Sequence, residues 1–128
     1  MERSEDRRVT VERPLVGVVG PCGAGKTALV IALRRYGIAA REVAQEHSYV
    51  PAMWQRLTDP DLLIYLDVSR QEAERRKGRV LPPAYWQQLV ERLAHARANA
   101  DLVVDTDHLT LDDVLADVLS FLETYGGT

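Results

Sequence analysis

The chain has 128 residues, a formal net charge of −3 and a single cysteine. This length suits one domain with a substantial core, the charge gives no general attraction to nucleic acid or anionic membranes, and one cysteine excludes an internal disulfide. We find no apolar leader and no apolar run long enough to cross a bilayer, so we expect a cytoplasmic protein. Residues 1–13 mix acids and bases with little to bury, and we expect a flexible tail ahead of one domain over residues 14–128.

The first predicted strand leads into a glycine-rich loop. Residues 15–19 form an apolar run typical of a buried parallel strand, and residues 28–36 have the pattern of a helix that ends at Gly37. Between them, the sequence Gly-Pro-Cys-Gly-Ala-Gly-Lys-Thr fills every fixed position of the phosphate-binding motif GxxxxGK[ST]. The residues expected to bind a nucleotide are Gly20, Cys22, Gly23, Ala24, Gly25, Lys26, Thr27 and Ala28.

Each part of this motif predicts a distinct contact. The glycines let consecutive backbone N–H groups converge on phosphate oxygens, and the following helix N-terminus favours an anion. Lys26 is expected to reach the β- and γ-phosphates, and Thr27 to offer its hydroxyl to Mg²⁺. The alternative is a glycine-rich turn with an exposed lysine, but the correct flanking elements argue against it.

The middle of the chain alternates short strands and helices. Residues 38–43 form a plausible second strand, weakened by its alanines, and residues 46–57 are ambiguous apart from one short helix around Trp54. Residues 62–68 are a clear buried strand. Ser69 is expected to cap a helix that runs to about residue 77, with Glu72 at the capping-box position.

The last third of the chain continues this alternation. A long amphipathic helix is predicted over about 84–100, a strand over 102–104, and a final helix capped by Thr110 and ended by Gly126 and Gly127. Parallel strands need crossover helices that cover both faces of the sheet. The sequence therefore predicts a three-layer α/β/α sandwich with a mainly parallel sheet of four or five strands, the P-loop NTPase fold.

Three segments together resemble the P-loop small-molecule and nucleotide kinases, which include nucleoside monophosphate, deoxynucleoside and shikimate kinases. The segments are Gly20 to Thr27, Asp61 to Ser69 with the arginines that follow, and Ala100 to Thr110. The resemblance implies transfer of a phosphoryl group from ATP, with Mg²⁺, to a small-molecule acceptor. It also implies a basic lid, in which we favour Arg75 and Arg79, and a loop beside the purine that contains Asp107 and His108. Each arginine could equally belong to a solvated helix face.

The resemblance further implies a strand beside the phosphate-loop strand that ends in an acidic residue. No separate strand of that kind fits between Val43 and Asp61. Glu46, and second Glu42, are the candidates to position the acceptor, and Asp67 is the candidate acid at the metal. Glu42 could instead face solvent from an edge strand, and Asp67 could cap the next helix.

Other chemistries find no support in the residue pattern. Neither zinc-ligand spacing, nor a GxSxG nucleophile elbow, nor the Asn-Lys-x-Asp segment of regulatory GTPases occurs. A kinase is the leading hypothesis. The alternatives are a nucleotide-binding or sensor module that has lost catalysis and acts through a protein partner, and a structural domain with an empty loop. A homodimer that completes the shortened site stays open.

Overall fold

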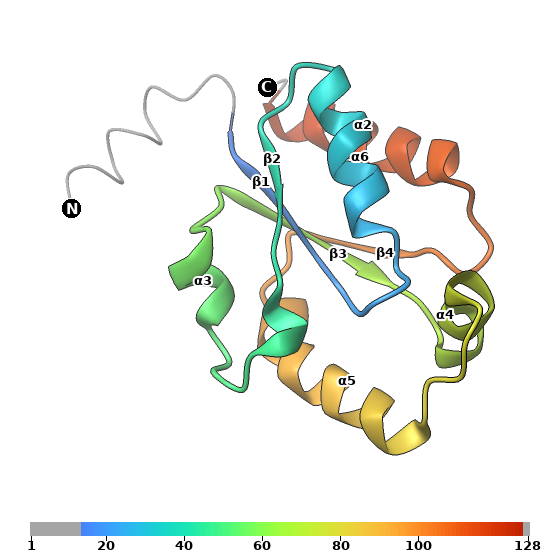
Figure 1. The fold of residues 1–128 in the computed structure, drawn as a ribbon. Coiled ribbons are helices and arrows are strands. Elements are labelled where there is room, and N and C mark those ends of the chain that lie inside the picture. Colours follow the sequence, from blue (N-terminus) through green and yellow to red (C-terminus); the bar gives the residue numbers. More distant parts are fainter. Residues whose placement is uncertain (1–13, 127–128) are drawn as a thin grey trace.

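The computed structural model describes residues 14–126, and the strands in that range form one parallel sheet (Figure 1). The expected tail over residues 1–13 and the expected role of Gly127 lie outside the described residues. The strands lie side by side in the order β2-β1-β3-β4. Their bounds are Val16–Val19 for β1, Ala40–Glu42 for β2, Leu62–Asp67 for β3 and Leu102–Asp105 for β4. This confirms the predicted fold class; within residues 14–126 the sheet has four strands and not five.

Helices cover both faces of this sheet. On one face lie α2 (Lys26–Arg35) and α6 (Leu111–Gly126), and on the other lie α3 (Met53–Leu57) and α5 (Pro83–Ala98) (Figure 1). The helix α4 (Arg70–Lys77) follows the carboxyl end of β3, and a single turn of 3-10 helix, η1 (Gln45–His47), follows β2. Sites in α/β proteins form at the carboxyl ends of the parallel strands. Both η1 and α4 begin at this edge of the sheet, η1 after β2 and α4 after β3.

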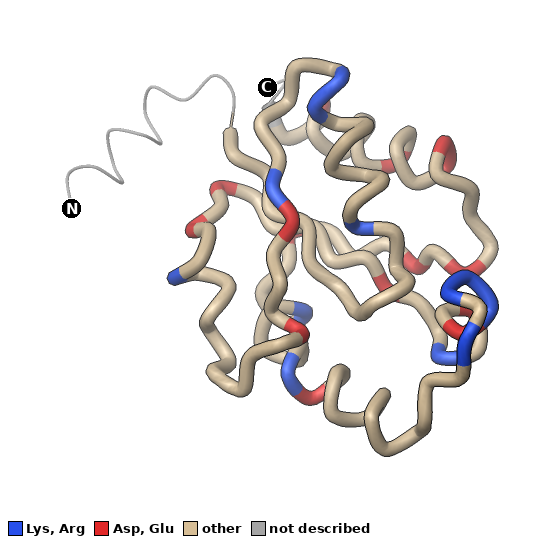
Figure 2. The backbone as a smooth tube through the Cα atoms, viewed as in Figure 1, with Lys and Arg blue, Asp and Glu red and all other residues tan. Residues whose placement is uncertain are grey.

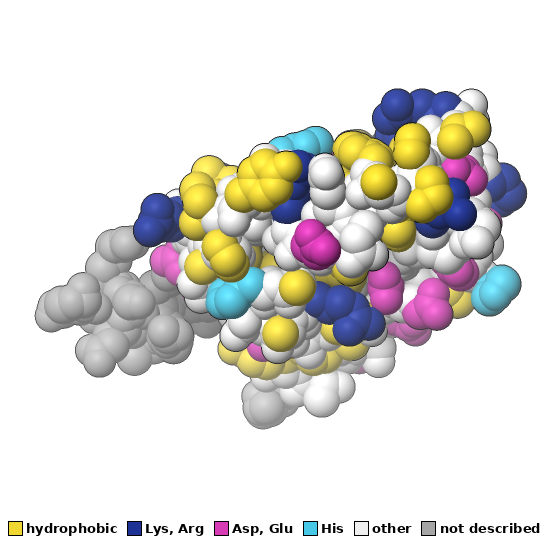
Figure 3. All heavy atoms as spheres, turned by 90° about the horizontal axis from the view of Figure 1, so that it is seen from below, with side chains coloured by type: hydrophobic (Ala, Val, Ile, Leu, Met, Phe, Trp, Pro, Cys, Tyr) yellow, Lys and Arg dark blue, Asp and Glu magenta, His cyan; other side chains and the backbone are white. Residues whose placement is uncertain are grey.

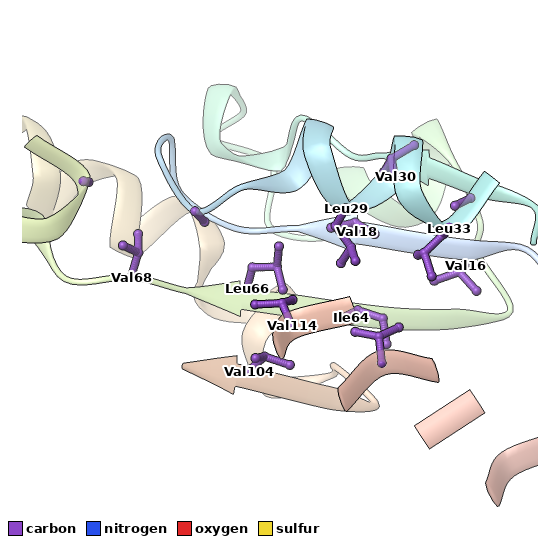
Figure 4. Packing of buried hydrophobic residues seen from close by; sticks show 14 of the residues in the cluster. Val16, Val18, Leu29, Val30, Leu33, Ile64, Leu66, Val68, Val104 and Val114 are labelled. Atoms are coloured by element: carbon purple, nitrogen blue, oxygen red, sulfur yellow. The ribbon is translucent and has the colours of Figure 1, made fainter. Parts of the chain in front are cut away.

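The larger part of the core lies between the sheet and the pair α2 and α6 (Figure 4). Side chains alternate along a strand, so β1 sends Val16 and Val18 to this face and β3 sends Ile64 and Leu66. The helix residues that meet them include Leu29, Leu33, Val114 and Val118. Leu111, the first residue of α6, is exposed.

The second part of the core explains where two acidic side chains point. Leu63 and Tyr65 of β3 pack against α5, and Asp67 has the same parity, so its carboxylate also faces α5. Glu42 has the parity of Ala40, which packs with the α2 side. The sheet therefore directs Glu42 toward α2 and its phosphate loop, and Asp67 away from them.

Two helix starts use side-chain caps in different ways. At α6 the capping box is complete. The Asp113 amide donates to Thr110 Oγ1 at 3.1 Å, and the Thr110 amide donates to Asp113 Oδ2 at 3.0 Å. At α4 only half forms: Ser69 Oγ accepts from the Glu72 amide at 3.1 Å. The expected return bond from Glu72 is absent in the described structure because arginines take its carboxylate, and the Ser69 amide instead donates to Asp107 Oδ1 at 2.8 Å.

Candidate functional site

The phosphate-binding loop joins β1 to α2, as the motif requires. A Cβ at Gly20 would lie 2.3 Å from the Leu66 carbonyl oxygen, so only glycine fits against β3 at that position. Gly25 has a φ of 99° at the start of α2, a left-handed conformation that favours glycine. The first N–H groups of α2 have no acceptor within the helix, so the loop presents backbone donors to an anion.

Lys26 folds back over this loop. Its ammonium donates to the carbonyl oxygens of Gly20 at 2.8 Å and Pro21 at 3.3 Å, and lies 3.0 Å from Glu46 Oε2. An ammonium has three hydrogens, so these contacts occupy all its donors. The Lys26 and Glu46 side chains are each only 6% exposed. The structure thus joins the motif lysine directly to the acid favoured from the sequence.

Glu46 lies on η1, where its carboxylate is buried at the edge of the loop. Oε2 contacts Lys26 and lies 3.7 Å from His47 Nε2. Oε1 is buried and has no hydrogen-bond partner among the described residues. A buried carboxylate oxygen without a donor costs free energy, so this atom marks a place where a bound group would supply one.

Glu42 contacts the second functional residue of the motif. The Thr27 hydroxyl donates to Glu42 Oε1 at 2.7 Å. Glu42 ends β2, which pairs directly with β1 through the register Val18 to Glu42. The acid at the end of a strand beside the phosphate-loop strand is therefore present, on the short strand whose alanines made it the weakest prediction.

Two cavities meet at the loop, and both are lined by Gly25 and Ala28. The first, of about 530 Å³, contains the motif lysine and both acids; its lining residues are Cys22, Gly23, Gly25, Lys26, Thr27, Ala28, Glu42, Glu46, His47, Lys77, Arg79 and Tyr85. The second, of about 360 Å³, lies between the loop, α4 and the start of α6, and its lining includes Ala24, Arg75, Arg76, Asp107 and His108. Because they share Gly25 and Ala28 as lining residues, the two cavities are adjacent parts of one candidate site.

Basic residues gather on α4 and the turn that follows it (Figure 2). The two favoured arginines line different cavities, with Arg75 at the smaller one and Arg79 at the larger. Arg75 Nε donates to the Glu72 carboxylate at 3.0 Å. The hydrogen bonds that Glu72 accepts, first from Arg75 and then from Arg76, lower its pKa to about 2. Within residues 14–126, Arg79 and Lys77 make no side-chain hydrogen bond or ion pair, so both are available to a ligand.

Arg76 lines the smaller cavity and connects three segments around it, a role that the sequence did not single out. Its guanidinium donates to Gly23 O at 3.0 Å, to Thr106 Oγ1 at 3.1 Å and to Thr106 O at 2.6 Å. It also donates to Glu72 at 2.9 Å. Arg76 therefore joins α4 to the phosphate loop and to the loop after β4. The sequence carries no signal that separates it from its basic neighbours, because Thr106 is brought to it only by the fold.

The remaining predicted residues divide between the site and the opposite face of the sheet. Asp107 and His108 line the smaller cavity. Asp67 faces α5, where Oδ2 accepts from Arg97 at 3.2 Å and Oδ1 accepts from the Val68 amide at 3.1 Å. Asp67 does not line either cavity described above. The contacts of the described residues thus bring Glu42 to Thr27, and they leave Asp67 with α5.

Between residues 14 and 126, no helix has the length and apolar character needed to cross a bilayer. The same residues contain no group of three or more His, Cys, Asp or Glu side chains able to hold a metal ion. Seen from the α5 side, apolar surface side chains are interspersed with charged ones (Figure 3).

These features define a P-loop NTPase fold: a parallel sheet with helices on both faces and a phosphate-binding loop between β1 and α2. A solved structure of shikimate kinase from Acinetobacter baumannii, in complex with shikimate, has the same fold with a TM-score of 0.62. The two chains are 15% identical over 92% of this chain and 97% of that chain. Comparison with protein-family models and with curated proteins gives no match.

Proposed function

We propose that this protein is a P-loop kinase that binds ATP with Mg²⁺ and transfers the γ-phosphoryl group to a small acceptor. The observation that carries the proposal is the pairing of both functional residues of the motif with acids at the same cavity. Lys26 contacts Glu46 at 3.0 Å, and Thr27 contacts Glu42 at 2.7 Å. Nucleotide binding by the loop does not need the acid beside Lys26, whereas phosphoryl transfer needs a group that orients a nucleophile.

The two cavities supply separate places for nucleotide and acceptor. The smaller cavity, lined by Leu109, Val114 and the loop after β4, suits a purine. The triphosphate then crosses the loop past Gly25, and the acceptor occupies the larger cavity, which Arg79 and Lys77 line together with the two acids. In the reaction, an acceptor oxygen bonds to the γ-phosphorus, the bond from that phosphorus to the bridging oxygen breaks, ADP leaves, and any proton on the acceptor oxygen passes to water. Glu46 orients the acceptor, while Lys26 and Arg79 stabilise the negative charge.

The residues at the loop fit a magnesium ion. Mg²⁺ prefers oxygen ligands and keeps several waters and phosphate oxygens, so it needs few protein groups. The Thr27 hydroxyl and the Glu42 carboxylate, already in contact, are the groups that would hold it, and these contacts favour Glu42 over Asp67 for this role. When bound, the ion neutralises charge on the phosphates.

A coupled assay that reports ADP, run across nucleosides, nucleotides and small hydroxylated metabolites, tests the proposal. Turnover that exceeds that of Lys26→Ala for at least one acceptor is expected. Circular dichroism must show that the variant is folded at the assay temperature. If no acceptor raises turnover above the variant, the kinase proposal fails.

One observation favours a second candidate, a nucleotide-binding module without catalysis. The segment between β2 and β3 holds only η1 and α3, so the chain has little room for a dedicated acceptor-binding insert. Calorimetry separates the two candidates, because a module binds Mg-ATP yet shows no turnover in the acceptor screen.

A further inference from the structure

We infer that Gln45 is a positioning residue that holds Glu46 against Lys26, a role that rests on the proposed function. Gln45 is fully buried, at 0% exposure, in a turn that is otherwise close to the surface. A buried amide must satisfy its hydrogens and its oxygen, so its partners show what it fixes in place.

The Gln45 side chain ties three segments together. Its Oε1 accepts from the Trp54 amide at 2.7 Å, which anchors the start of α3. Its Nε2 faces the carbonyl oxygens of Val50 at 2.9 Å, Arg92 at 3.2 Å and Ser48 at 3.4 Å. This set demands one group that both accepts and donates, which an amide provides and a carboxylate or an apolar side chain does not.

Arg92 holds the backbone of Glu46 from the other side, and we call Gln45 and Arg92 together the clamp. Arg92 Nη1 donates to the Glu46 carbonyl oxygen at 3.1 Å, and the Arg92 guanidinium lies over the Tyr49 ring at 4.1 Å. The main chain of Glu46 is therefore fixed between the buried amide of Gln45 and a guanidinium from α5. From this main-chain position the Glu46 carboxylate reaches the loop, where it meets Lys26 at 3.0 Å.

This placement makes Glu46 a competitor of the triphosphate. Lys26 must turn from the carboxylate toward the phosphates, and the buried carboxylate repels an incoming anion. A clamped Glu46 cannot move away, so it stays in the cavity as the group that receives the acceptor. A variant that loosens the clamp should therefore bind nucleotide more tightly, because Glu46 can then move away from the triphosphate. A variant that loosens the whole fold should instead bind nucleotide more weakly.

A double-mutant cycle on nucleotide affinity tests this role. Calorimetry with ATPγS in excess EDTA isolates the competition from metal binding. Glu46→Gln is expected to tighten binding about tenfold, since the charge that opposes the triphosphate is gone. Gln45→Met is expected to tighten binding about threefold in the wild-type background and to have no effect in the Glu46→Gln background, because the two residues act through one contact.

Matched controls separate the clamp from general effects. Glu123→Gln removes the same charge from the exposed side of α6, and Gln88→Met makes the same substitution at an exposed site on α5; neither should change affinity. Gln45→Asn keeps a polar amide but is one methylene too short, and it replaces Gln45→Met if circular dichroism shows that the latter is unfolded.

The outcomes are distinct. Tighter binding by the Gln45 variant that disappears in the Glu46→Gln background supports the role. Weaker binding, or an equal effect in both backgrounds, overturns it while the proposed function stands. If the wild-type protein binds no nucleotide even with Mg²⁺, the proposed function fails and the role of Gln45 falls with it.

Discussion

The Lys26 ammonium and the Glu46 carboxylate lie 3.0 Å apart, and each side chain is 6% exposed. The lysine starts α2 and the glutamate lies in the turn after β2, so the fold alone brings them together. Removing one partner from a buried ion pair leaves an uncompensated charge, which costs more than removing both. This relationship links the stability of the protein to its proposed chemistry.

Lys26→Met is expected to destabilise the protein by about 3 kcal/mol, because Glu46 becomes a buried unpaired charge. The double variant Lys26→Met, Glu46→Gln should recover part of that loss. Urea unfolding followed by circular dichroism measures both values. Lys77→Met, at an exposed site on α4, is the control; equal stability of the two lysine variants would contradict the buried pair.

Glu42→Gln is expected to reduce the gain in nucleotide affinity that Mg²⁺ provides by about tenfold, because the carboxylate beside Thr27 is lost. The measurement is the ratio of ATPγS dissociation constants with EDTA and with excess Mg²⁺. Asp67→Asn, whose carboxylate faces Arg97, should leave that ratio unchanged. The reverse pattern would assign the metal to Asp67.

Arg76→Met is expected to destabilise the protein by about 2 kcal/mol more than Arg75→Met. Arg76 donates to Gly23 and Thr106 in a partly buried site, whereas Arg75 is exposed and pairs with Glu72 alone. Denaturant midpoints of the two variants give the difference. Two matching midpoints would show that Arg76 does not join α4 to the phosphate loop.

Stability at alkaline pH reports on Tyr65. Burial first, and then the negative charge of Asp67, raises the pKa of this phenol from 10.0 to about 12. The native state therefore binds the proton more tightly than the unfolded state, and stability should fall as the pH rises from about 10 toward 12.

Tyr65→Phe lacks this ionisation, so its unfolding free energy should fall less than that of the wild type between pH 10 and 12. Tyr36→Phe, at an exposed site, controls for the general effect of alkali. Rapid-mixing urea unfolding limits chemical damage at high pH. Parallel curves for Tyr65→Phe and the wild type would contradict the burial of this hydroxyl.

Local patterns predicted the fold and the centre of the site. The strand, loop and helix around Gly20 to Thr27 follow from short-range rules, and so do the buried strand β3 and the cap at Thr110. The fold class is confirmed because alternating strands and helices leave few topologies open. The resemblance to kinases and their position in the chain made Glu42 and Glu46 candidates, and the structure adds which motif residue each one contacts.

Other features depend on packing that no local pattern encodes. Gln45 has four partners from three segments, and its sequence neighbours give no sign that it is buried. Arg76 and Arg75 are adjacent arginines that differ because only one meets Thr106. The direction of Asp67 follows from strand parity and from Arg97 on α5, so its place in the fold could not be read from the end of a strand alone.

Calorimetry with Mg-ATPγS on the wild-type chain and on Lys26→Ala tests the central claim most directly. We expect saturable binding of one nucleotide per chain. The dissociation constant of the variant should be at least tenfold higher, a loss of about 1.4 kcal/mol in binding free energy. Flat titrations of the wild-type protein, or equal binding by the two proteins, would contradict it.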